Sequence, residues 1–253
     1  MMGRSHAVTG AFAFQGALVW SATTPYFPHD LGSQVLGTIV CTGAALLPDI
    51  DHEKATVSNT YGPVTRAISE VIQWAAGGHR NGTHSIFGIG LLGASAQAAV
   101  TYQHVPGWPM VVSKIWLCLL LILASAGAVR LLKIDGYVDD FAPIPVSAAL
   151  VVFEPVPLDF VPLALVLGAA VHVAGDMLTN GGCPLFWPLV PKKGKTSRSK
   201  KRGGGGTKRG PKRYALGLFK TGGFTENWLV LPVSILGTLA LIGWRILEWL
   251  SIV

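Results

Sequence analysis

Eight ionisable residues lie at or just outside the ends of long apolar stretches, in a chain that carries few charges elsewhere. They are His6, Asp49, Asp51, His52, His79, His84, His172 and Asp176. Ionisable side chains at membrane depth are costly and usually mark a functional site. Imidazole nitrogens beside hard carboxylate oxygens suit zinc, manganese, iron or magnesium. If the apolar stretches end on one side of a membrane, these residues can form one metal site.

The segment LLPDIDHEK (46–54) contains the densest of these clusters. Because Pro48 disfavours helical geometry at Leu47, we expect a helix to stop there. Side chains alternate with period two in an extended segment, so Asp49 and Asp51 are predicted to point the same way. We interpret the two carboxylates as metal ligands. The alternative is an acidic turn at a helix end, facing water.

The segment GGHRNGTHS (77–85) is a Gly-rich loop that enters a predicted helix. Thr83 is expected to cap this helix, whose free N–H groups would form an anion site. Arg80 can hold a phosphate or a carboxylate through its fork of donors. His84 is interpreted as a metal ligand or a general acid/base, and His79 as a ligand or a residue supporting one. The alternative is an exposed polar loop.

The segment HVAGDMLTNGG (172–182) contains a histidine and an aspartate four residues apart. On a helix, His172 and Asp176 are neighbours on one face, so both can reach one metal ion. The alternative is a hydrogen bond between them without a metal. Beyond this segment, Trp187 is interpreted as an aromatic anchor at the membrane interface. Glu226 is interpreted as a partner of a helix dipole rather than a further ligand.

The composition indicates a membrane protein. Half of the 253 residues are hydrophobic, 13% are charged, and the mean hydropathy is +0.48. Soluble domains carry about 25% charged residues, so this class is excluded. We predict an all-α, polytopic integral membrane bundle that forms a single domain over residues 1–253. The three cysteines are widely spaced and show no CxxC pair, so no disulfide framework is expected.

About five to seven membrane segments are expected, since a spanning helix needs roughly 20 apolar residues. The candidate segments are 7–28, 31–48, 85–102, 115–129, 141–153, 160–178 and 228–244. Segment 141–153 is short and contains two prolines, so we expect it to be short, tilted or re-entrant. Segment 64–76 is amphipathic and is predicted to be an interfacial helix.

The basic residues predict how the chain is oriented in the membrane. Residues 192–213 hold 11 of the 20 Lys and Arg and no acid, and they are rich in Gly. We predict a disordered cytoplasmic loop that contacts anionic lipid, and we disfavour nucleic-acid binding. With this loop and Arg4 inside, all eight residues fall on the cytoplasmic face, whereas His29 and His104 fall opposite. This assignment of segment ends to the two sides of the membrane requires segment 141–153 to cross it.

Four motifs occur in a distinctive order. They are GRSH (3–6), LLPDIDHEK (46–54), GHRNGTHS (78–85) and HVAGDMLTNGGCPLFWP (172–188). They resemble the YdjM-like family, whose members are classed as membrane-bound metal-dependent hydrolases. The family pattern runs from a near-N-terminal His through LLPDIDH and HRGxTHS to HxxxDMLTxxGxxLLWP. The resemblance extends from residue 3 to about residue 230, and it implies that the eight residues form the family's site.

The sequence departs from the family pattern at two places. Asn81 stands where the family has Gly, and the basic loop is a long insertion. Neither departure removes a candidate ligand. A weaker likeness in ligand order to zinc-dependent phospholipases C and related nucleases suggests a phosphoester substrate.

These observations predict a multi-pass inner-membrane hydrolase with a site that faces the cytoplasm. We expect one or two divalent metal ions, zinc first and manganese, iron or magnesium otherwise, to activate water against a phosphoester or lipid-like substrate. The predicted metal ligands are His6, Asp49, Asp51, His84, His172 and Asp176, and the predicted catalytic residues are Arg80, His79 and His52. The expected partners are membrane lipid and a small-molecule or lipid substrate. The alternative is a metal-ion or proton transporter that uses the same cluster.

Overall fold

The computed structural model describes residues 1–20, 27–130, 136–189 and 213–252, and this part of the chain is all-helical. Two isolated β-bridges occur, and no strand is found among the described residues. The α-helices are α1 (Gly3–Trp20), α2 (Leu31–Ala44), α3 (Pro63–Ala75), α4 (Ile86–Tyr102), α5 (Trp108–Val129), α6 (Gly136–Phe141), α7 (Pro143–Phe153), α8 (Val161–Leu178) and α9 (Leu231–Ile252). The predicted all-α class is therefore confirmed.

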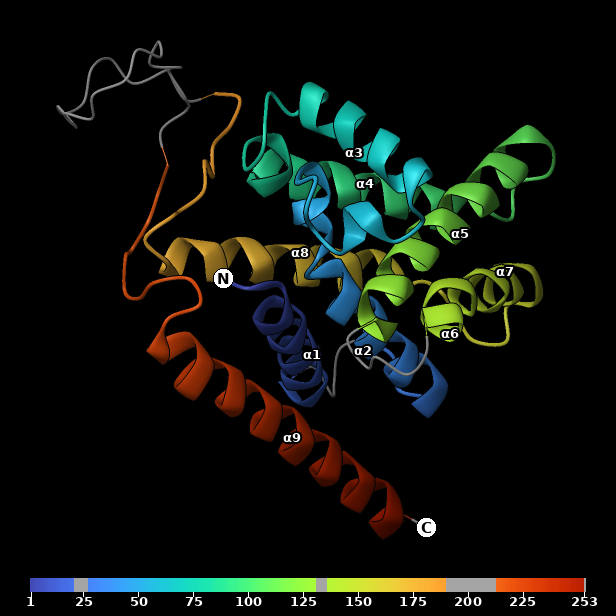
Figure 1. Cartoon of the computed structure of the whole chain (residues 1–253). Coiled ribbons are helices and arrows are strands. Elements are labelled where there is room, and N and C mark those ends of the chain that lie inside the picture. Colours follow the sequence, from blue (N-terminus) through green and yellow to red (C-terminus); the bar gives the residue numbers. More distant parts are fainter. Residues whose placement is uncertain (21–26, 131–135, 190–212, 253) are drawn as a thin grey trace, which may run out of the picture.

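Helices α1, α2 and α8 form the centre of the bundle (Figure 1). Helix α2 packs against α1, α5 and α8, and α4 covers α8 and α5. A Cβ atom on Gly43 would lie only 1.6 Å from the Ala124 carbonyl oxygen, and one on Gly168 would lie 2.5 Å from that of Cys41. Small residues at such crossings let helix backbones approach closely, as is common between membrane helices.

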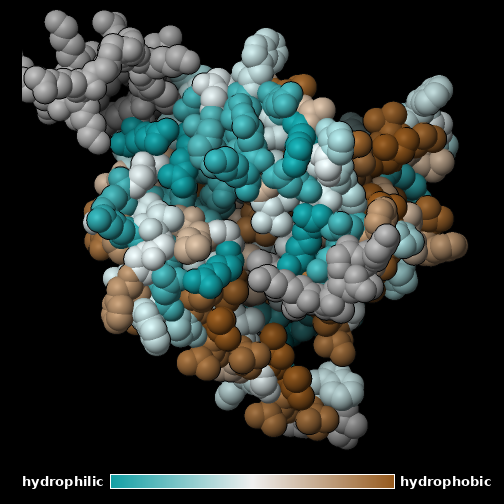
Figure 2. Space-filling model, in the orientation of Figure 1, coloured by the Kyte–Doolittle hydropathy of each residue, from teal (hydrophilic) through white to brown (hydrophobic). Residues whose placement is uncertain are grey.

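Four helices of the described residues are long and apolar enough to cross a membrane. These spans are Leu31–Asp51, Trp108–Val129, Val161–Leu178 and Glu226–Leu250, and α4 is a shorter apolar helix. The expected five to seven segments include α1, α4 and α7 in addition. Apolar residues gather over α9, whereas hydrophilic residues gather near α3 (Figure 2). The chain is a polytopic helical membrane protein.

Several helix boundaries differ from those expected. Helix α1 begins at Gly3, so His6 lies inside its first turn rather than before it. Helix α5 begins at Trp108 instead of residue 115 and includes Lys114. The Lys114 ammonium reaches Glu154 at 2.9 Å, because a long side chain can carry its charge to the end of an apolar helix. Cysteines in the described residues are free, as expected.

Segment 141–153 forms α7, which follows the short helix α6. With 11 residues, α7 is about 16 Å long, well short of a hydrocarbon core of about 30 Å. Nevertheless, α6 and α7 together follow the length of α5. Asp140 accepts from the Arg130 Nε at 2.9 Å at one end, and Glu154 pairs with Lys114 at the other. This broken helix pair therefore carries the chain between the two ends of the bundle, and its crossing of the membrane stays a prediction.

Most of the basic segment 192–213 lies outside the described residues, as does Lys133. The chain that follows the basic segment runs beside the end of α8. The Leu216 N–H donates to the Met177 carbonyl oxygen at 2.7 Å, and the Leu218 N–H donates to that of Leu178 at 2.9 Å. The segment that follows the basic run is therefore attached to the helix that carries His172 and Asp176.

Candidate metal centre

The predicted site residues meet at one end of the bundle. They come from the start of α1, the 3-10 turn η1 (Leu47–Asp51) after α2, the loop before α4 with its turn η3 (Gly82–His84), and the last turns of α8. Within the described part of the chain, two groups of side chains could hold a metal ion, each with ligand atoms within 4.8 Å of one another. They are His6, His172 and Asp176, and Asp49, His84 and His172. Both groups contain His172.

His172 is fully buried and has a fixed tautomer. Its Nδ1 lies 2.7 Å from the carbonyl oxygen of Ala45. A carbonyl oxygen only accepts, so Nδ1 carries the proton and donates it. In the neutral ring, Nε2 is then left with a free lone pair, as in a metal-binding histidine held by a hydrogen bond at its other nitrogen.

The tautomer of His84 is fixed by a relay of hydrogen bonds. The Thr83 hydroxyl donates its proton to Asp51 Oδ2 at 2.5 Å. Its oxygen therefore accepts from His84 Nδ1, which lies 3.0 Å away. His84 Nε2 is then also a free lone pair in the neutral ring. A carboxylate that acts through a neighbouring group to orient a histidine is typical of metal sites.

The free nitrogens of these two rings face each other. His84 Nε2 and His172 Nε2 lie 3.1 Å apart in a fully buried environment. Two lone pairs at this separation repel unless a proton or a cation binds between them. Two nitrogen ligands of a tetrahedral zinc ion lie about 3.3 Å apart, given zinc–nitrogen bonds of about 2.05 Å. The arrangement therefore fits a divalent metal ion.

Asp49 completes this group on its open side. Its Oδ1 lies 3.4 Å from His84 Nε2 and 3.8 Å from His172 Nε2. The Asp49 side chain is 22% exposed, whereas the two histidines are inaccessible. Three protein ligands with one open position are typical of catalytic zinc sites. A water molecule or substrate would reach this group past Asp49.

His6 and Asp176 form the other half of the cluster. The His6 ring stacks on His172, with centroids 3.7 Å apart, and a Cβ on Gly175 would lie 3.3 Å from the His6 ring. Its Nε2 lies 3.2 Å from Asp176 Oδ1, but neither ring nitrogen forms a hydrogen bond. Such buried unpaired atoms are rare and point to an ion or a catalytic role. The α-amine of Met1 also contacts Asp176.

Asp51 supports the site from behind and belongs to neither group. Its Oδ1 accepts from His79 Nδ1 at 2.8 Å, and its Oδ2 accepts from the Arg80 N–H at 3.0 Å. The prediction that Asp49 and Asp51 point the same way is wrong. The LPDID segment is a 3-10 turn, with three residues per turn, because proline is well suited to the start of a helical turn. The two carboxylates therefore point in different directions.

Comparison with protein families agrees with the motifs. A family profile described as YdjM inner membrane protein matches residues 1–249. The chain belongs to this family. Searches of curated proteins and of solved structures return no match. The resemblance inferred from the four motifs is confirmed, and so is the membrane location, whereas the description of the YdjM family states no reaction.

The partition of histidines along this YdjM-family chain is confirmed by the structure. Five of the seven gather at the candidate centre, whereas the other two lie at the opposite end. There, His104 Nε2 lies 3.6 Å from Glu154, and the backbone carbonyl of His29 accepts from Gln34. Asn81, which replaces the usual Gly of the YdjM family, fits the loop by donating from Nδ2 to the Gly77 carbonyl oxygen at 2.5 Å.

Arg80 is held against the cluster. Its Nη2 lies 3.2 Å from Asp176 Oδ2, and a Cβ on Gly181 would lie 2.7 Å from its Nη1. The backbone φ of Arg80 is +59°, an uncommon conformation for a residue with a side chain. The loop therefore accepts local strain while it places this guanidinium beside a candidate ligand. Its Nε is buried without a hydrogen-bond partner.

His52 and His79 lie at the edge of the centre. Their rings meet edge to face with centroids 4.4 Å apart, and neither residue belongs to the two groups. His52 Nδ1 accepts from the Lys54 N–H at 3.0 Å. His79 donates from Nδ1 to Asp51, so its Nε2 remains free to accept a proton. Of these two histidines, His79 has the geometry of a general base.

The expected cap and anion site at the start of α4 are wrong. Ser85, rather than Thr83, is the N-cap residue, because its side chain accepts from the Gly88 N–H at 3.1 Å. The Ile86 N–H donates to the Leu185 carbonyl oxygen at 2.9 Å. Thr83 instead uses its hydroxyl in the relay to His84. The N–H groups of Ile86 and Gly88 in the first turn of α4 are thus already occupied by protein acceptors.

Glu226 supports the site in a way that the sequence interpretation did not identify. Glu226 is fully buried and accepts from the Met2 N–H at 2.6 Å and the Gly222 N–H at 2.8 Å, so it holds the start of α1 rather than its own helix. In the sequence, the signal for this role was a single Glu just before an apolar helix.

Burial raises the pKa of the Cys183 thiol to about 11, so this cysteine stays protonated and is not a competing thiolate.

Proposed function

We propose that this chain is a membrane-bound, metal-dependent hydrolase. The observation that carries the proposal is the pair of facing Nε2 atoms of His84 and His172, 3.1 Å apart, with each Nδ1 already donating a hydrogen bond. Asp49 supplies the third ligand, its Oδ1 3.4 Å from His84 Nε2, and leaves one position open to water or substrate. Nitrogen and carboxylate ligands favour zinc, with manganese, iron or magnesium as alternatives.

The number of ions follows from the ring nitrogens. His172 has a single free nitrogen, since its Nδ1 donates to Ala45. The two groups that contain His172 therefore cannot each hold a separate ion through it. We propose one tightly bound ion at Asp49, His84 and His172. A second ion would have to bind through His6 and Asp176 alone, where Met1 and Arg80 already contact the carboxylate.

The surrounding side chains have separate roles in hydrolysis. Asp49, His84 and His172 would hold a divalent ion, which would supply Lewis acidity to activate water and polarise the scissile group. His79 Nε2 would accept the proton of the attacking water, while Asp51 holds the ring in place through Nδ1. His52 packs against the His79 ring and restricts its orientation. Arg80 stabilises the negative charge that develops on the substrate. To do so, its guanidinium exchanges part of its contact with Asp176 for contact with the substrate.

A phosphoester or lipid-like molecule is the substrate class we propose. Arg80 is the cationic side chain best placed to bind a phosphate, and the exposed edge of Asp49 is where a substrate would approach. The basic residues of segment 192–213 and Arg4 favour a cytoplasmic position for this end of the bundle. Membrane lipid would then supply the substrate from the inner leaflet, and the basic segment would contact anionic lipid.

The transporter alternative requires polar groups along a path through the bundle. In α8, the buried residues between its first turn and His172 are apolar or small, namely Val161, Pro162, Ala164, Leu165, Gly168 and Ala169. The ionisable residues of α8, His172 and Asp176, are instead confined to the last turns of this helix. This distribution favours hydrolysis at one end over transport. Metal uptake into proteoliposomes that is lost in His172→Ala would reverse the preference.

The proposal is tested by metal analysis of the detergent-purified protein. We expect close to one divalent ion per chain in the wild type and loss of most of it in His172→Ala and Asp49→Ala. The matched control is His104→Ala at the opposite end, where the metal content should not change. Unchanged metal in both site variants would overturn the proposed centre. A phosphodiester and lipid-phosphate hydrolysis screen on the metal-loaded protein then tests the reaction.

A further inference from the structure

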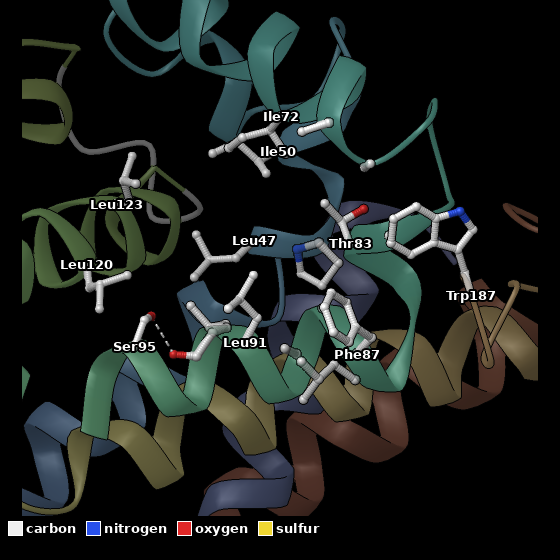
Figure 3. A pocket seen from close by; sticks show the side chains of 18 of the residues that line it. Leu47, Ile50, Ile72, Thr83, Phe87, Leu91, Ser95, Leu120, Leu123 and Trp187 are labelled. Carbon is white, nitrogen blue, oxygen red and sulfur yellow. Dashed lines mark hydrogen bonds between the residues drawn. The ribbon is translucent and has the colours of Figure 1, made fainter. Parts of the chain in front are cut away.

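An apolar cavity of about 560 Å³ lies beside the candidate metal centre (Figure 3). Helices α3, α4 and α5 and the η1 turn form its walls. Leu47, Phe87, Leu91, Leu120 and Trp187 are among the lining residues. This volume is within the range of small-molecule sites, about 300–1,000 Å³. None of the ionisable residues of the candidate centre lines it.

One end of the cavity adjoins the residues of the metal centre. Thr83 lines the cavity and also donates to Asp51, and the lining residue Pro48 directly precedes Asp49. Figure 3 shows Thr83 and Trp187 at this end and Ser95 and Leu123 at the other. From Phe87 to Ser95, eight residues along α4 correspond to about 12 Å of depth. The cavity is thus an elongated apolar space that starts at the proposed reaction site.

The cavity opens sideways on the surface of α4 and α5. Leu91 is 62% exposed and Trp116 is 42% exposed, although both line the cavity. These apolar helices face hydrocarbon in a membrane protein. Because the cavity is apolar and opens toward hydrocarbon, water is a poor occupant, and protein interiors pack without large voids. Hydrocarbon from the lipid is therefore the occupant that fits the opening.

Helix α3 positions the lipid headgroup layer relative to the cavity. Its buried residues are the polar Thr65 and Ser69, whereas Val64, Val71 and Trp74 are exposed, the last at 84%. A helix with an apolar face directed outward lies in the plane of a membrane interface. Ile72 of the same helix lines the cavity. The headgroup layer would then be level with the metal centre.

We propose that the cavity holds one acyl chain of a membrane phospholipid, with its phosphate and ester groups at the Thr83 end and its methyl end toward Ser95. One leaflet of hydrocarbon is about 15 Å deep, close to the length of the cavity. The chain would thereby hold the headgroup against Asp49 and Arg80. This inference rests on the proposed hydrolase function, since it assigns the class of substrate to the same site.

The test measures lipid that remains bound, not activity. Purified protein is loaded with dipalmitoyl or dioctanoyl phosphatidylglycerol, washed in detergent, and analysed by native mass spectrometry together with its metal content. Ser95→Trp fills the far end of the cavity, and Ala94→Trp places the same side chain on the exposed side of α4. We expect Ser95→Trp to retain at least fivefold less dipalmitoyl lipid than Ala94→Trp, with similar retention of dioctanoyl lipid and unchanged metal.

Equal retention of dipalmitoyl lipid by Ser95→Trp and Ala94→Trp would overturn the acyl-chain site. Equal loss of both lipids in Ser95→Trp, with normal metal, would overturn the chain direction that we assign. Leu123→Trp fills the same end from α5 and must give the same pattern if Ser95→Trp does not fold. A wild-type dimer that retains no lipid would show that a second copy covers the opening. Loss of metal in the wild type would instead refute the hydrolase proposal, independently of lipid retention.

Discussion

The two ends of the helical bundle contain the same residue types but bury them differently. At the candidate centre, His6, His84 and His172 are fully buried and lie within reach of Asp49 and Asp176. At the opposite end, the ionisable side chains are exposed or partly exposed to solvent. These residues are His29, Asp30, His104, Lys114, Glu154 and Asp159. The first end bears the cost of dehydrating its charged groups, whereas the second keeps them hydrated.

This difference in the burial of ionisable side chains distinguishes a ligand-binding site from an ordinary helix end at the membrane surface. A charged residue at a membrane surface needs no special partner, because water or a nearby counter-ion suffices. Groups that are removed from water require hydrogen bonds, counter-charges or a metal ion. His6 has no hydrogen bond at either nitrogen, and His84 and His172 direct free nitrogens at each other. The unsatisfied end is therefore the one that we expect to bind a ligand.

The largest expected effect is that of Asp176→Asn. This change leaves the Arg80 guanidinium without its counter-charge and removes a candidate ligand. We expect a loss of about 3 kcal/mol in unfolding free energy, because breaking a buried ion pair leaves an uncompensated charge. The measurement is the thermal unfolding midpoint in detergent, with and without added zinc.

Asp159→Asn is the matched control at the opposite end. Its side chain is exposed, so the change should stay within about 0.5 kcal/mol. Equal shifts in the two variants would show that the two ends do not differ in the way described.

A medium effect is expected for Thr83→Val, which removes the hydroxyl between Asp51 and His84. His84 Nδ1 would lose its acceptor, at a cost of about 1–3 kcal/mol. Zinc affinity should fall roughly 10–100-fold, as for other losses of a group that orients a metal ligand. Isothermal titration with zinc measures this change. Thr101→Val at the far end of α4 should bind zinc normally, and normal affinity in Thr83→Val would refute the relay.

The smallest effect is expected for the ion pair between Lys114 and Glu154. Both side chains are partly exposed, and the pair lies at the end of the bundle away from the centre. A double-mutant cycle with Lys114→Met and Glu154→Gln should give a coupling free energy below about 1 kcal/mol and no change in metal content. A coupling as large as the Asp176→Asn effect would remove the contrast between the two ends.

The sequence predicted which residues meet but not how they are connected. Motif order and apolar segments were sufficient for the helices and for the convergence of His6, Asp49, His84 and Asp176, because each lies at the end of an apolar helix. The direction of Asp51 depended on a 3-10 turn that alternation rules do not indicate. Such local geometry is selected by tertiary contacts, here the hydrogen bonds of Asp51 to the loop before α4.

Contacts with backbone atoms were beyond sequence reasoning altogether. The carbonyl of Ala45 fixes His172, although alanine carries no functional side chain. Trp187 was interpreted as an interfacial anchor, but it lines the cavity beside Gly82, where a Cβ would lie 3.0 Å from the indole. An aromatic residue near a helix end is compatible with both roles, and its packing against Gly82 and Phe87 is a contact that the sequence does not indicate.

We propose that a metal ion binds between His84 and His172 at one end of the bundle. X-ray absorption spectroscopy at the zinc edge tests it most directly. We expect nitrogen and oxygen ligands at about 2.0–2.1 Å, scattering from two imidazoles, no sulfur at about 2.3 Å, and the loss of one imidazole in His84→Ala. A sulfur shell, an unchanged imidazole count in His84→Ala, or failure of the wild type to bind zinc or another divalent ion would contradict it.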